Sequence, residues 1–304
     1  MKSLRIGTRG SDLALWQARH IAERLRQATG VSVDIKIIQT EADLKPEMPL
    51  TPEDWPTGGF TTALEEALLA GSIDLAVHSL KDLPTQSPHD LVIASIPERG
   101  PVHDVILARS AEIADALRLA LDKGKLPSQP VNIGSSSPRR AWQAERFLGC
   151  TAVPIRGNVP TRIAKLIAGQ YDAICLAAAG LHRLNLQHDY QINLPIDRFP
   201  TAPGQGALAV QTHRAAEWIS LLQAIDHQPT RQCVQAERTF LHVMKAGCHA
   251  PLAASAVLQD NQIRLHVQMR LGNKTSFEQI AYGADPEQLG QQLAEQALQA
   301  ERQP

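Results

Sequence analysis

The chain has 304 residues, a formal net charge of −1 at pH 7 and a hydrophobic fraction of 43%, with only 4% aromatic residues. This length predicts two or three domains with sizeable cores. The balanced charge and the scarcity of aromatic side chains argue against a nucleic-acid-binding protein, which needs a basic field or stacking surfaces.

Strand and helix patterns alternate over the first two thirds of the chain. A helix capped by Ser11 is expected to end before Gly30, and further helices are expected at residues 61–70, 111–121, 139–147 and 161–168. Strands are expected at residues 4–7, 33–39, 73–77, 91–95, 105–108, 131–134, 152–155, 172–177 and 207–211. This βαβ order predicts mostly parallel sheets with helices on both faces.

Four prolines interrupt this rhythm within residues 43–57. They exclude a helix or a central strand and predict a long loop of the kind that serves as a lid. After residue 211 the pattern changes to helices at 215–224 and 230–245, strands at 252–258 and 263–270, and a helix at 286–300. We therefore expect a third, smaller α+β domain that begins near Asp226.

Lys81 and Asp82 follow directly after the buried strand predicted at 73–77, and Pro84 ends the segment. Ligands of open α/β sheets bind beyond the carboxyl ends of the strands. The pair is therefore either part of a binding site or a solvated surface pair, and these residues alone do not decide between the two.

Arginines recur where a predicted strand leads into a helix: Arg9 at the first junction, Arg139 and Arg140 at the second, Arg156 and Arg162 at the third. A positive side chain in the first turn of a helix is locally unfavourable by roughly 0.3–1 kcal/mol. An anion bound at that place reverses the sign of the interaction, and a guanidinium group matches a carboxylate or a phosphate. The repetition predicts a pocket for a polyanion rather than scattered surface ion pairs.

Carboxylates are the better match for this pocket than a nucleotide. The chain has no G-x-x-x-x-G-K-[ST] loop, and no G-x-G-x-x-G follows the first strand. Neither a metal nor a nucleic acid is expected as a partner.

The cysteines are widely spaced and fit neither a disulfide framework nor a zinc site. Three of them lie within apolar patterns typical of buried, inert thiols. Cys248 instead follows a glycine in a predicted loop near Lys245, which favours a thiolate, and its position alone leaves a reactive and a structural role open. No signal peptide or membrane span is apparent, so we expect a cytoplasmic protein.

Seven segments, in order along nearly the whole chain, resemble the hydroxymethylbilane synthase family, also called porphobilinogen deaminase. They are residues 8–18 (TRGSDLALWQA), 77–84 (VHSLKDLP), 134–140 (GSSSPRR), 156–162 (RGNVPTR), 171–184 (YDAICLAAAGLHRL), 203–207 (PGQGA) and 247–251 (GCHAP). The resemblance implies two α/β domains like those of periplasmic binding proteins, with parallel or mixed sheets, and a smaller C-terminal α+β domain. It places domain 1 at 1–102 and 203–224, domain 2 at 103–202 and domain 3 at 225–304.

The same resemblance implies a transferase of haem and porphyrin biosynthesis that works as a monomer. Four porphobilinogen units would be joined head to tail to a dipyrromethane cofactor held by a thioether to Cys248, each with loss of ammonia, and hydrolysis would release hydroxymethylbilane. Asp82 is the expected catalytic residue, since a placed carboxylate stabilises pyrrole cations and moves protons. The expected cofactor-binding residues are Lys81, Ser135, Arg139, Arg140 and Arg162, and the expected substrate-binding residues are Arg9, Ser11, Arg156 and Arg183.

Two positions depart from the family pattern by lacking an expected basic residue. Thr57 stands where the family usually has a lysine, and His103 where an arginine is usual. They motivate an alternative hypothesis, a catalytically impaired or non-catalytic homologue that binds a pyrrole or another polyanion on the same scaffold. The presence of both Asp82 and Cys248 favours the enzyme.

Overall fold

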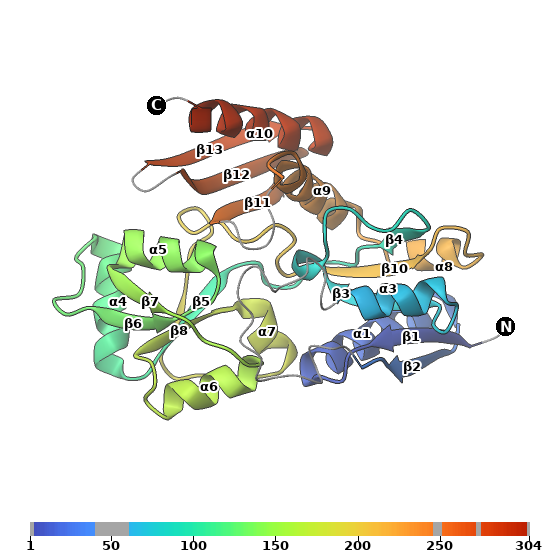
Figure 1. Cartoon of the computed structure of the whole chain (residues 1–304), viewed down its shortest axis with the longest axis horizontal. Coiled ribbons are helices and arrows are strands. Elements are labelled where there is room, and N and C mark those ends of the chain that lie inside the picture. The colour runs from blue at the N-terminus through green and yellow to red at the C-terminus, as the bar shows by residue number, and fades with distance from the viewer. Residues whose placement is uncertain (1–2, 40–60, 246–250, 272–274, 303–304) are drawn as a thin grey trace.

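The computed structural model describes residues 3–39, 61–245, 251–271 and 275–302. Within these ranges it contains two five-stranded sheets and one three-stranded sheet. Figure 1 shows the two larger sheets side by side, with the C-terminal unit packed above them.

The first sheet has the strand order β2-β1-β3-β10-β4. Strand β1 pairs in parallel with β2 and β3, whereas β10 is antiparallel to β3 and β4. The strands are β1 (Leu4–Thr8), β2 (Val33–Ile37), β3 (Leu75–Ser79), β4 (Leu91–Ser95) and β10 (Leu208–His213).

The second sheet repeats this plan with the order β7-β6-β8-β5-β9. Here β6 is parallel to β7 and β8, and β5 is antiparallel to β8 and β9. The strands are β5 (Asp104–Ala108), β6 (Val131–Gly134), β7 (Cys150–Val153), β8 (Ala173–Ala177) and β9 (Gln191–Asn193). Strand β10 in the first sheet and β5 in the second run antiparallel to their neighbours. Each follows strands of the other sheet in the sequence, so the chain crosses between the sheets twice: the first crossover joins β4 to β5 and the second joins β9 to β10.

Helices cover both sheets, as the βαβ pattern requires. In α1 (Asp12–Thr29), Ser11 caps the N-terminus, Gly30 ends the helix at φ +72°, and the buried stripe includes Ile21 and Leu25. The remaining helices of these two units are α3 (Thr62–Leu69), α4 (Ala111–Lys123), α5 (Pro138–Leu148), α6 (Val159–Ile167), α7 (Ala178–Arg183) and α8 (Ile219–Gln223).

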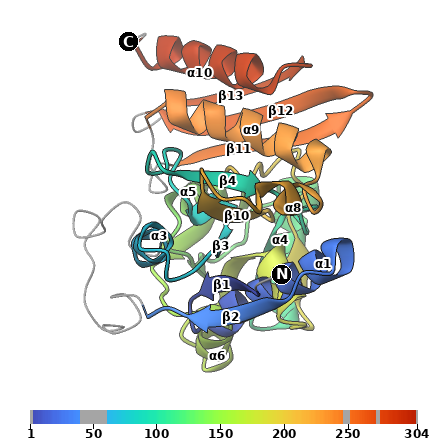
Figure 2. The same cartoon turned by 90° about the vertical axis from the view of Figure 1, so that its right-hand side faces the viewer.

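The C-terminal unit is an antiparallel sheet with two helices packed against it. Its elements are α9 (Gln228–Val243), β11 (Leu252–Gln259), β12 (Gln262–Leu271), β13 (Thr275–Gly283) and α10 (Pro286–Arg302). The helices approach closely where Gly290 meets α9, since a Cβ there would lie 2.5 Å from the carbonyl oxygen of Ala236. Figure 2 shows β11 and α9 nearest the rest of the molecule and α10 farthest from it.

The fold class expected from the sequence is confirmed: two mixed α/β sheets and a smaller α+β unit. Several details of the expectation were wrong. Strand β7 begins at Cys150 rather than at residue 152, the helix expected at 215–224 is the shorter α8, and β9, α7 and β13 were not expected. The predicted loop at 43–57 lies outside the described residues.

Candidate active site

Five strand ends bring the predicted site residues together. The strands β1 and β3 of the first sheet, and β6, β7 and β8 of the second, each lead directly into a segment that carries at least one of these residues. Carboxyl ends of parallel strands lie at one edge of a sheet, which is where α/β proteins bind ligands. In Figure 1, α7, which follows β8, lies beside one end of α1, which follows β1, so segments that follow strands of the two sheets are neighbours.

Lys81 and Asp82 lie in a single turn of 3-10 helix, η1 (Leu80–Asp82), directly after β3. The Asp82 side chain is exposed, whereas Lys81 is half-buried. Burial lowers the pKa of Lys81 to about 8, and repulsion from Arg140 adds to this effect, while Asp82 opposes it. The lowered pKa is therefore due first to burial of the amine and only second to the neighbouring guanidinium group.

Arg139 and Arg140, at the start of α5, are both buried and both bind one carboxylate, Asp104. Arg139 Nη1 lies 2.8 Å from Asp104 Oδ2, and Arg140 Nη2 lies 2.7 Å from Oδ1. Although burial alone raises the pKa of Asp104, attraction to the two guanidinium groups lowers it well below its usual range. One carboxylate faces two permanent positive charges, so the cluster keeps a net positive charge.

Gln205 completes this cluster, and it lies in the second crossover, between β9 and β10. Its Nε2 donates to Asp104 Oδ1 at 2.9 Å and to the carbonyl oxygen of Val102 at 2.7 Å, and its Oε1 accepts from Arg140 at 3.3 Å. The sequence did not identify Asp104 or Gln205 as site residues. Asp104 lies at the first position of a buried strand, and that unusual place for a carboxylate is the signal that could have revealed it.

Arg162 and Arg183 belong to the second sheet and interact electrostatically with Asp82 of the first. Burial lowers the pKa of Arg183 to about 10 and also lowers that of Arg162, while Asp82 acts in the opposite direction on both. Arg183 also donates to the carbonyl oxygen of Gly206 at 2.7 Å, and its guanidinium carbon lies 5.8 Å from the centre of the Trp16 ring. Asp82, which follows β3 of the first sheet, therefore lies near arginines that follow strands of the second sheet.

The other predicted residues lie at the same edges, and some already have structural roles. Ser11 caps α1 by accepting from the backbone N–H of Ala14 at 3.4 Å. Ser135 is buried after β6 and accepts from the N–H of Ser137 at 3.3 Å. Arg9 is half-buried after β1 and Arg156 is exposed after β7.

Of the two departures from the family pattern, only His103 lies within the described residues. His103 is half-buried, and its carbonyl oxygen accepts a hydrogen bond from the first N–H of α7 at 3.0 Å. It therefore lies beside Asp104, at the start of β5. Thr57 and Cys248 lie outside the described residues.

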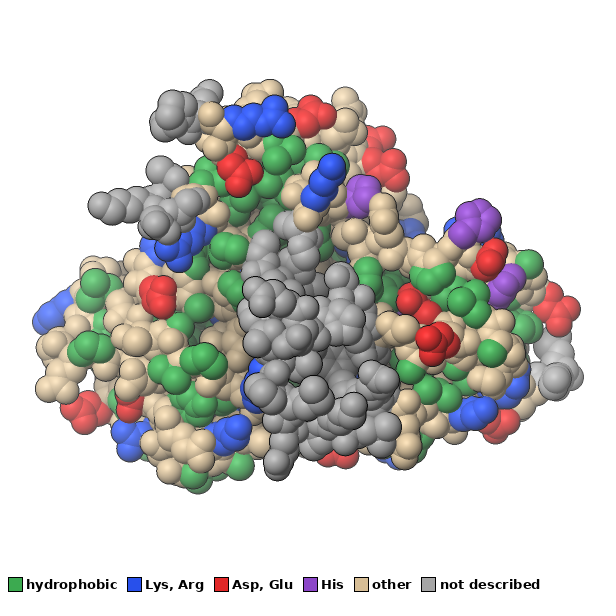
Figure 3. All heavy atoms as spheres, viewed as in Figure 1, with side chains coloured by type: hydrophobic (Ala, Val, Ile, Leu, Met, Phe, Trp, Pro, Cys, Tyr) green, Lys and Arg blue, Asp and Glu red, His purple; other side chains and the backbone are tan. Residues whose placement is uncertain are grey.

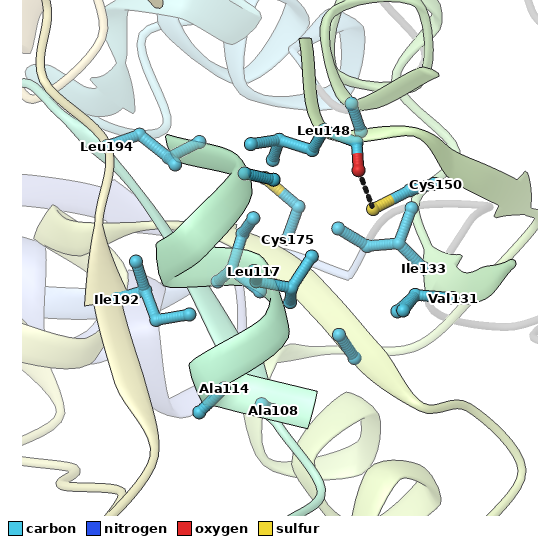
Figure 4. Packing of buried hydrophobic residues seen from close by; sticks show 14 of the residues in the cluster. Ala108, Ala114, Leu117, Val131, Ile133, Leu148, Cys150, Cys175, Ile192 and Leu194 are labelled. Atoms are coloured by element: carbon cyan, nitrogen blue, oxygen red, sulfur yellow. Dashed lines mark hydrogen bonds between the residues drawn. The ribbon is translucent and has the colours of Figure 1, made fainter. Parts of the chain in front are cut away.

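The three described cysteines are buried thiols without acidic character. Figure 4 shows Cys150 and Cys175 among apolar side chains of the second sheet, with Cys150 Sγ directed at the carbonyl oxygen of Leu148. Burial raises the pKa of each of these two to about 12 and that of Cys233 to about 11. The predicted burial of the three thiols is confirmed, and their raised pKa values disfavour the reactive thiolate form.

Positive charge is concentrated locally rather than over the surface. On the face shown in Figure 3, acidic and basic side chains are interspersed among the coloured atoms. Within the described ranges, no group of three His, Cys, Asp or Glu side chains could hold a metal ion, and no helix is long and apolar enough to cross a membrane.

This chain has a distant likeness to solved structures of substrate-binding proteins. An arginine-specific periplasmic binding protein of Salmonella typhimurium is 10% identical, with a TM-score of 0.39 over 74% of this chain and 91% of that chain. The second substrate-binding domain of GlnP from Lactococcus lactis is also 10% identical, with a TM-score of 0.41 over 74% and 87%. Nothing about function is inferred from likenesses of this degree.

Sequence relatives are much closer. Residues 4–220 match the family model described as porphobilinogen deaminase, dipyromethane cofactor binding domain, and residues 231–299 match that of the C-terminal domain. Porphobilinogen deaminase 1 of Streptomyces avermitilis is 41% identical over 88% of this chain and 83% of its own length. The porphobilinogen deaminase of Syntrophomonas wolfei is 38% identical over 98% and 96%. The chain belongs to the porphobilinogen deaminase family.

Proposed function

We propose that the protein is a hydroxymethylbilane synthase, a transferase that joins four porphobilinogen units head to tail with loss of ammonia at each step. The growing chain starts from a dipyrromethane unit attached to Cys248, and hydrolysis releases the linear product. The observation that carries the proposal is the convergence of positive side chains from two sheets around the exposed Asp82.

The described residues suit a dipyrromethane cofactor. Each of its two pyrrole rings bears an acetate and a propionate side chain, so the group is a polycarboxylate. The site offers Lys81 and Arg162 together with Arg139 and Arg140, two guanidinium groups that share the single carboxylate of Asp104. When bound, the cofactor supplies the free pyrrole position to which the first substrate unit is joined.

Positive and hydroxyl side chains are proposed to bind the carboxylates, and the carboxylate of Asp82 to act on the reacting ring. We assign the cofactor carboxylates, through charge-assisted hydrogen bonds, to Lys81, Arg139, Arg140 and Arg162, with Ser135 as a hydroxyl donor.

Arg9, Ser11, Arg156 and Arg183 are proposed to bind the carboxylates of porphobilinogen. Binding two reactants in fixed orientation makes their coupling effectively unimolecular, which is the main gain such side chains provide.

Asp82 is proposed to act on the reacting ring. Loss of ammonia needs a proton for the leaving amine, and coupling needs removal of a proton from the ring that has been attacked. A carboxylate placed at the ring stabilises the positive charge that develops there and carries these protons. Because the Asp82 side chain is exposed, substrate can reach it.

Domain boundaries, location and oligomeric state are part of the same proposal. Three domains at 1–102 with 203–224, 103–202 and 225–304 are supported by β10, which follows the second sheet in sequence but pairs with β3 and β4. We propose that the enzyme works in the cytoplasm as a monomer without a nucleic-acid partner, as the family resemblance implies. Gel filtration of the purified protein tests the monomer.

Intact mass measurement tests the cofactor. Protein expressed with porphobilinogen available should be heavier than its sequence by two porphobilinogen units less their ammonia, and Cys248→Ser should have the unmodified mass. An unmodified wild-type protein that binds porphobilinogen without converting it would instead support a non-catalytic homologue, the alternative raised by Thr57 and His103.

Asp82→Asn tests the catalytic assignment. This variant keeps the size and polarity of the side chain, so it should retain the cofactor mass and lose turnover by about 100-fold or more, the range expected for a general acid–base group. Formation of hydroxymethylbilane from porphobilinogen is the assay. Near-normal turnover would refute the role given to Asp82.

A further inference from the structure

Arg238, in the middle of α9, binds the backbone of the turn that carries Lys81 and Asp82. Its Nη2 donates to the carbonyl oxygen of Pro84 at 2.7 Å, and its Nη1 donates to that of Leu83 at 3.0 Å. Nη1 also lies 3.5 Å from the carbonyl oxygen of Leu80. One guanidinium group thus spans the turn from its start to the residues after its end.

The turn η1 has little support of its own. A 3-10 helix of three residues has weak hydrogen-bond geometry, and its internal bond runs from Leu83 N–H to the carbonyl oxygen of Leu80 at 3.2 Å. The start of the turn is held by the residue just before β10, since Leu80 N–H donates to the carbonyl oxygen of Ala207 at 3.0 Å. Arg238 supplies partners for the carbonyl groups at its end.

Apolar packing holds the same two elements together. Leu80 and Leu83 are almost fully buried and share a cluster with Val234, which lies one helical turn before Arg238 on α9. Asp82, between these two leucines, remains exposed on the side where it interacts with the arginines of the second sheet. The turn is therefore fixed through its buried residues, and its carboxylate is left available.

We propose that Arg238 is a positioning residue for Asp82, which fixes the turn η1 against α9. This inference rests on the catalytic role proposed for Asp82. It also gives α9 two roles, because the helix ends at Val243, five residues before Cys248 in the sequence, so that one helix holds the turn and leads to the cysteine.

The geometry requires an arginine. A guanidinium group is planar and presents several N–H donors in a fixed fork, which is what two neighbouring carbonyl oxygens need. A lysine carries the same charge but as a single flexible point, so Arg238→Lys keeps the charge and loses the fork. Arg238→Gln removes both.

Arg231 offers a matched control on the same helix. It ties α9 to β4 of the first sheet through the carbonyl oxygen of Ala94 at 3.1 Å and also pairs with Asp226, just before α9, at 2.6 Å, but these contacts are away from η1. Arg231→Gln therefore removes a comparable interface arginine without releasing the turn. A loss of stability alone would affect both variants in the same way.

The experiment compares cofactor-loaded wild type, Arg238→Gln, Arg238→Lys and Arg231→Gln. A displacement of the reacting group by about 1 Å costs up to about 100-fold in rate, so kcat should fall about 10- to 100-fold in Arg238→Gln and less in Arg238→Lys. The KM for porphobilinogen and the cofactor mass should stay close to wild type. In Arg231→Gln, kcat should stay close to wild type.

Hydrogen exchange followed by mass spectrometry gives a readout that does not depend on activity. Peptides that contain residues 80–85 should exchange faster in both Arg238 variants than in wild type or Arg231→Gln. Equal exchange in all four proteins, or equal loss of kcat in Arg238→Gln and Arg231→Gln, would overturn the proposal. If instead Asp82→Asn stays active, the catalytic role of Asp82 fails, while the exchange data still decide whether Arg238 holds the turn.

Discussion

At the scale of single residues, Lys81 is the most sensitive probe of the site. Burial and the repulsion of Arg140 lower its pKa to about 8. In Cys248→Ser, which cannot carry the proposed cofactor, about half of the Lys81 amines should therefore be neutral and nucleophilic near pH 8. Trace acetylation between pH 6 and 11, with the modified peptides quantified by mass spectrometry, should give a midpoint near this value.

An exposed lysine gives the comparison for this prediction. Lys123 lies at the exposed end of α4 and serves as the reference in the same digest. Cofactor-loaded wild type should titrate Lys81 at a higher pH than Cys248→Ser, because bound carboxylates stabilise the ammonium form. If Lys81 and Lys123 titrate together in Cys248→Ser, the lowered pKa assigned to Lys81 is wrong.

The arginines show how far a sequence reveals a site. Their places at strand-to-helix junctions predicted an anion, and this prediction depended only on local chain order. The structure adds that Arg139 and Arg140 already share the carboxylate of Asp104, 35 or more positions away in sequence. A local pattern contains no information about such a partner, because only the crossing of the chain between the sheets brings Asp104 to α5.

At the scale of elements, β3 carries a buried histidine whose side chain helps connect three segments. His78 Nε2 and Gln211 Oε1 are 3.0 Å apart, and Gln211 Nε2 donates to Glu65 of α3 at 2.9 Å and lies 3.4 Å from Ser87 Oγ. Burial lowers the pKa of His78 to about 4, although the bond with Gln211 acts in the opposite direction. The strand that leads to Asp82 therefore contains a histidine that is neutral in the native state.

His78 should make the protein less stable in acid. Its pKa is about 4 in the folded chain and about 6.5 when unfolded, so the unfolded state binds the proton first as the pH falls. The contribution is fully present above pH 6.5 and is lost towards pH 4, by up to roughly 3 kcal/mol at about 1.4 kcal/mol per pH unit. Urea denaturation across this range measures it.

Two variants separate this effect from general acid sensitivity. His78→Gln removes the titrating group and should reduce the loss of stability between pH 6.5 and 4, although its stability at neutral pH will also be lower. His89 is exposed beside Asp90, so His89→Gln should keep the wild-type pH dependence. The assignment is wrong if His78→Gln loses as much stability on acidification as wild type.

Helices and strands whose apolar residues recur with a clear period were predictable. Very short elements, and a strand with apolar residues on both faces, were not. The buried stripe of α1 and its end signals were visible in the sequence. Strand β9 has three residues and α7 has six, which is too short for a period to develop. In β13 the alternation is obscured, because Phe277 packs on the core while Ile280 and Tyr282 are apolar but exposed. Strands β5 and β10 were predicted, but their antiparallel direction was not, because direction depends on the crossover.

At the scale of the whole molecule, the three sheets meet at one carboxylate. Glu237 of α9 is fully buried and accepts from Arg99 Nη1 of the first crossover at 2.9 Å and from Gly204 N–H of the second at 2.7 Å. It also accepts from Ala256 N–H of β11 at 2.8 Å. The crossovers themselves touch where Gly206, at φ +82°, leaves no room for a Cβ against the carbonyl oxygen of Gly100.

Glu237→Gln should therefore uncouple the C-terminal unit from the other two. The variant leaves the nearly buried Arg99 without its counter-charge, which costs about 3–5 kcal/mol for a broken buried pair. No tryptophan occurs after residue 218, so tryptophan fluorescence does not report the C-terminal unit directly, whereas far-UV circular dichroism does. In urea the two signals should coincide for wild type and separate for Glu237→Gln.

Glu287→Gln, an exposed change on α10, is the control and should behave as wild type. Coincident curves for Glu237→Gln at the wild-type midpoint would show that the junction does not couple the three units.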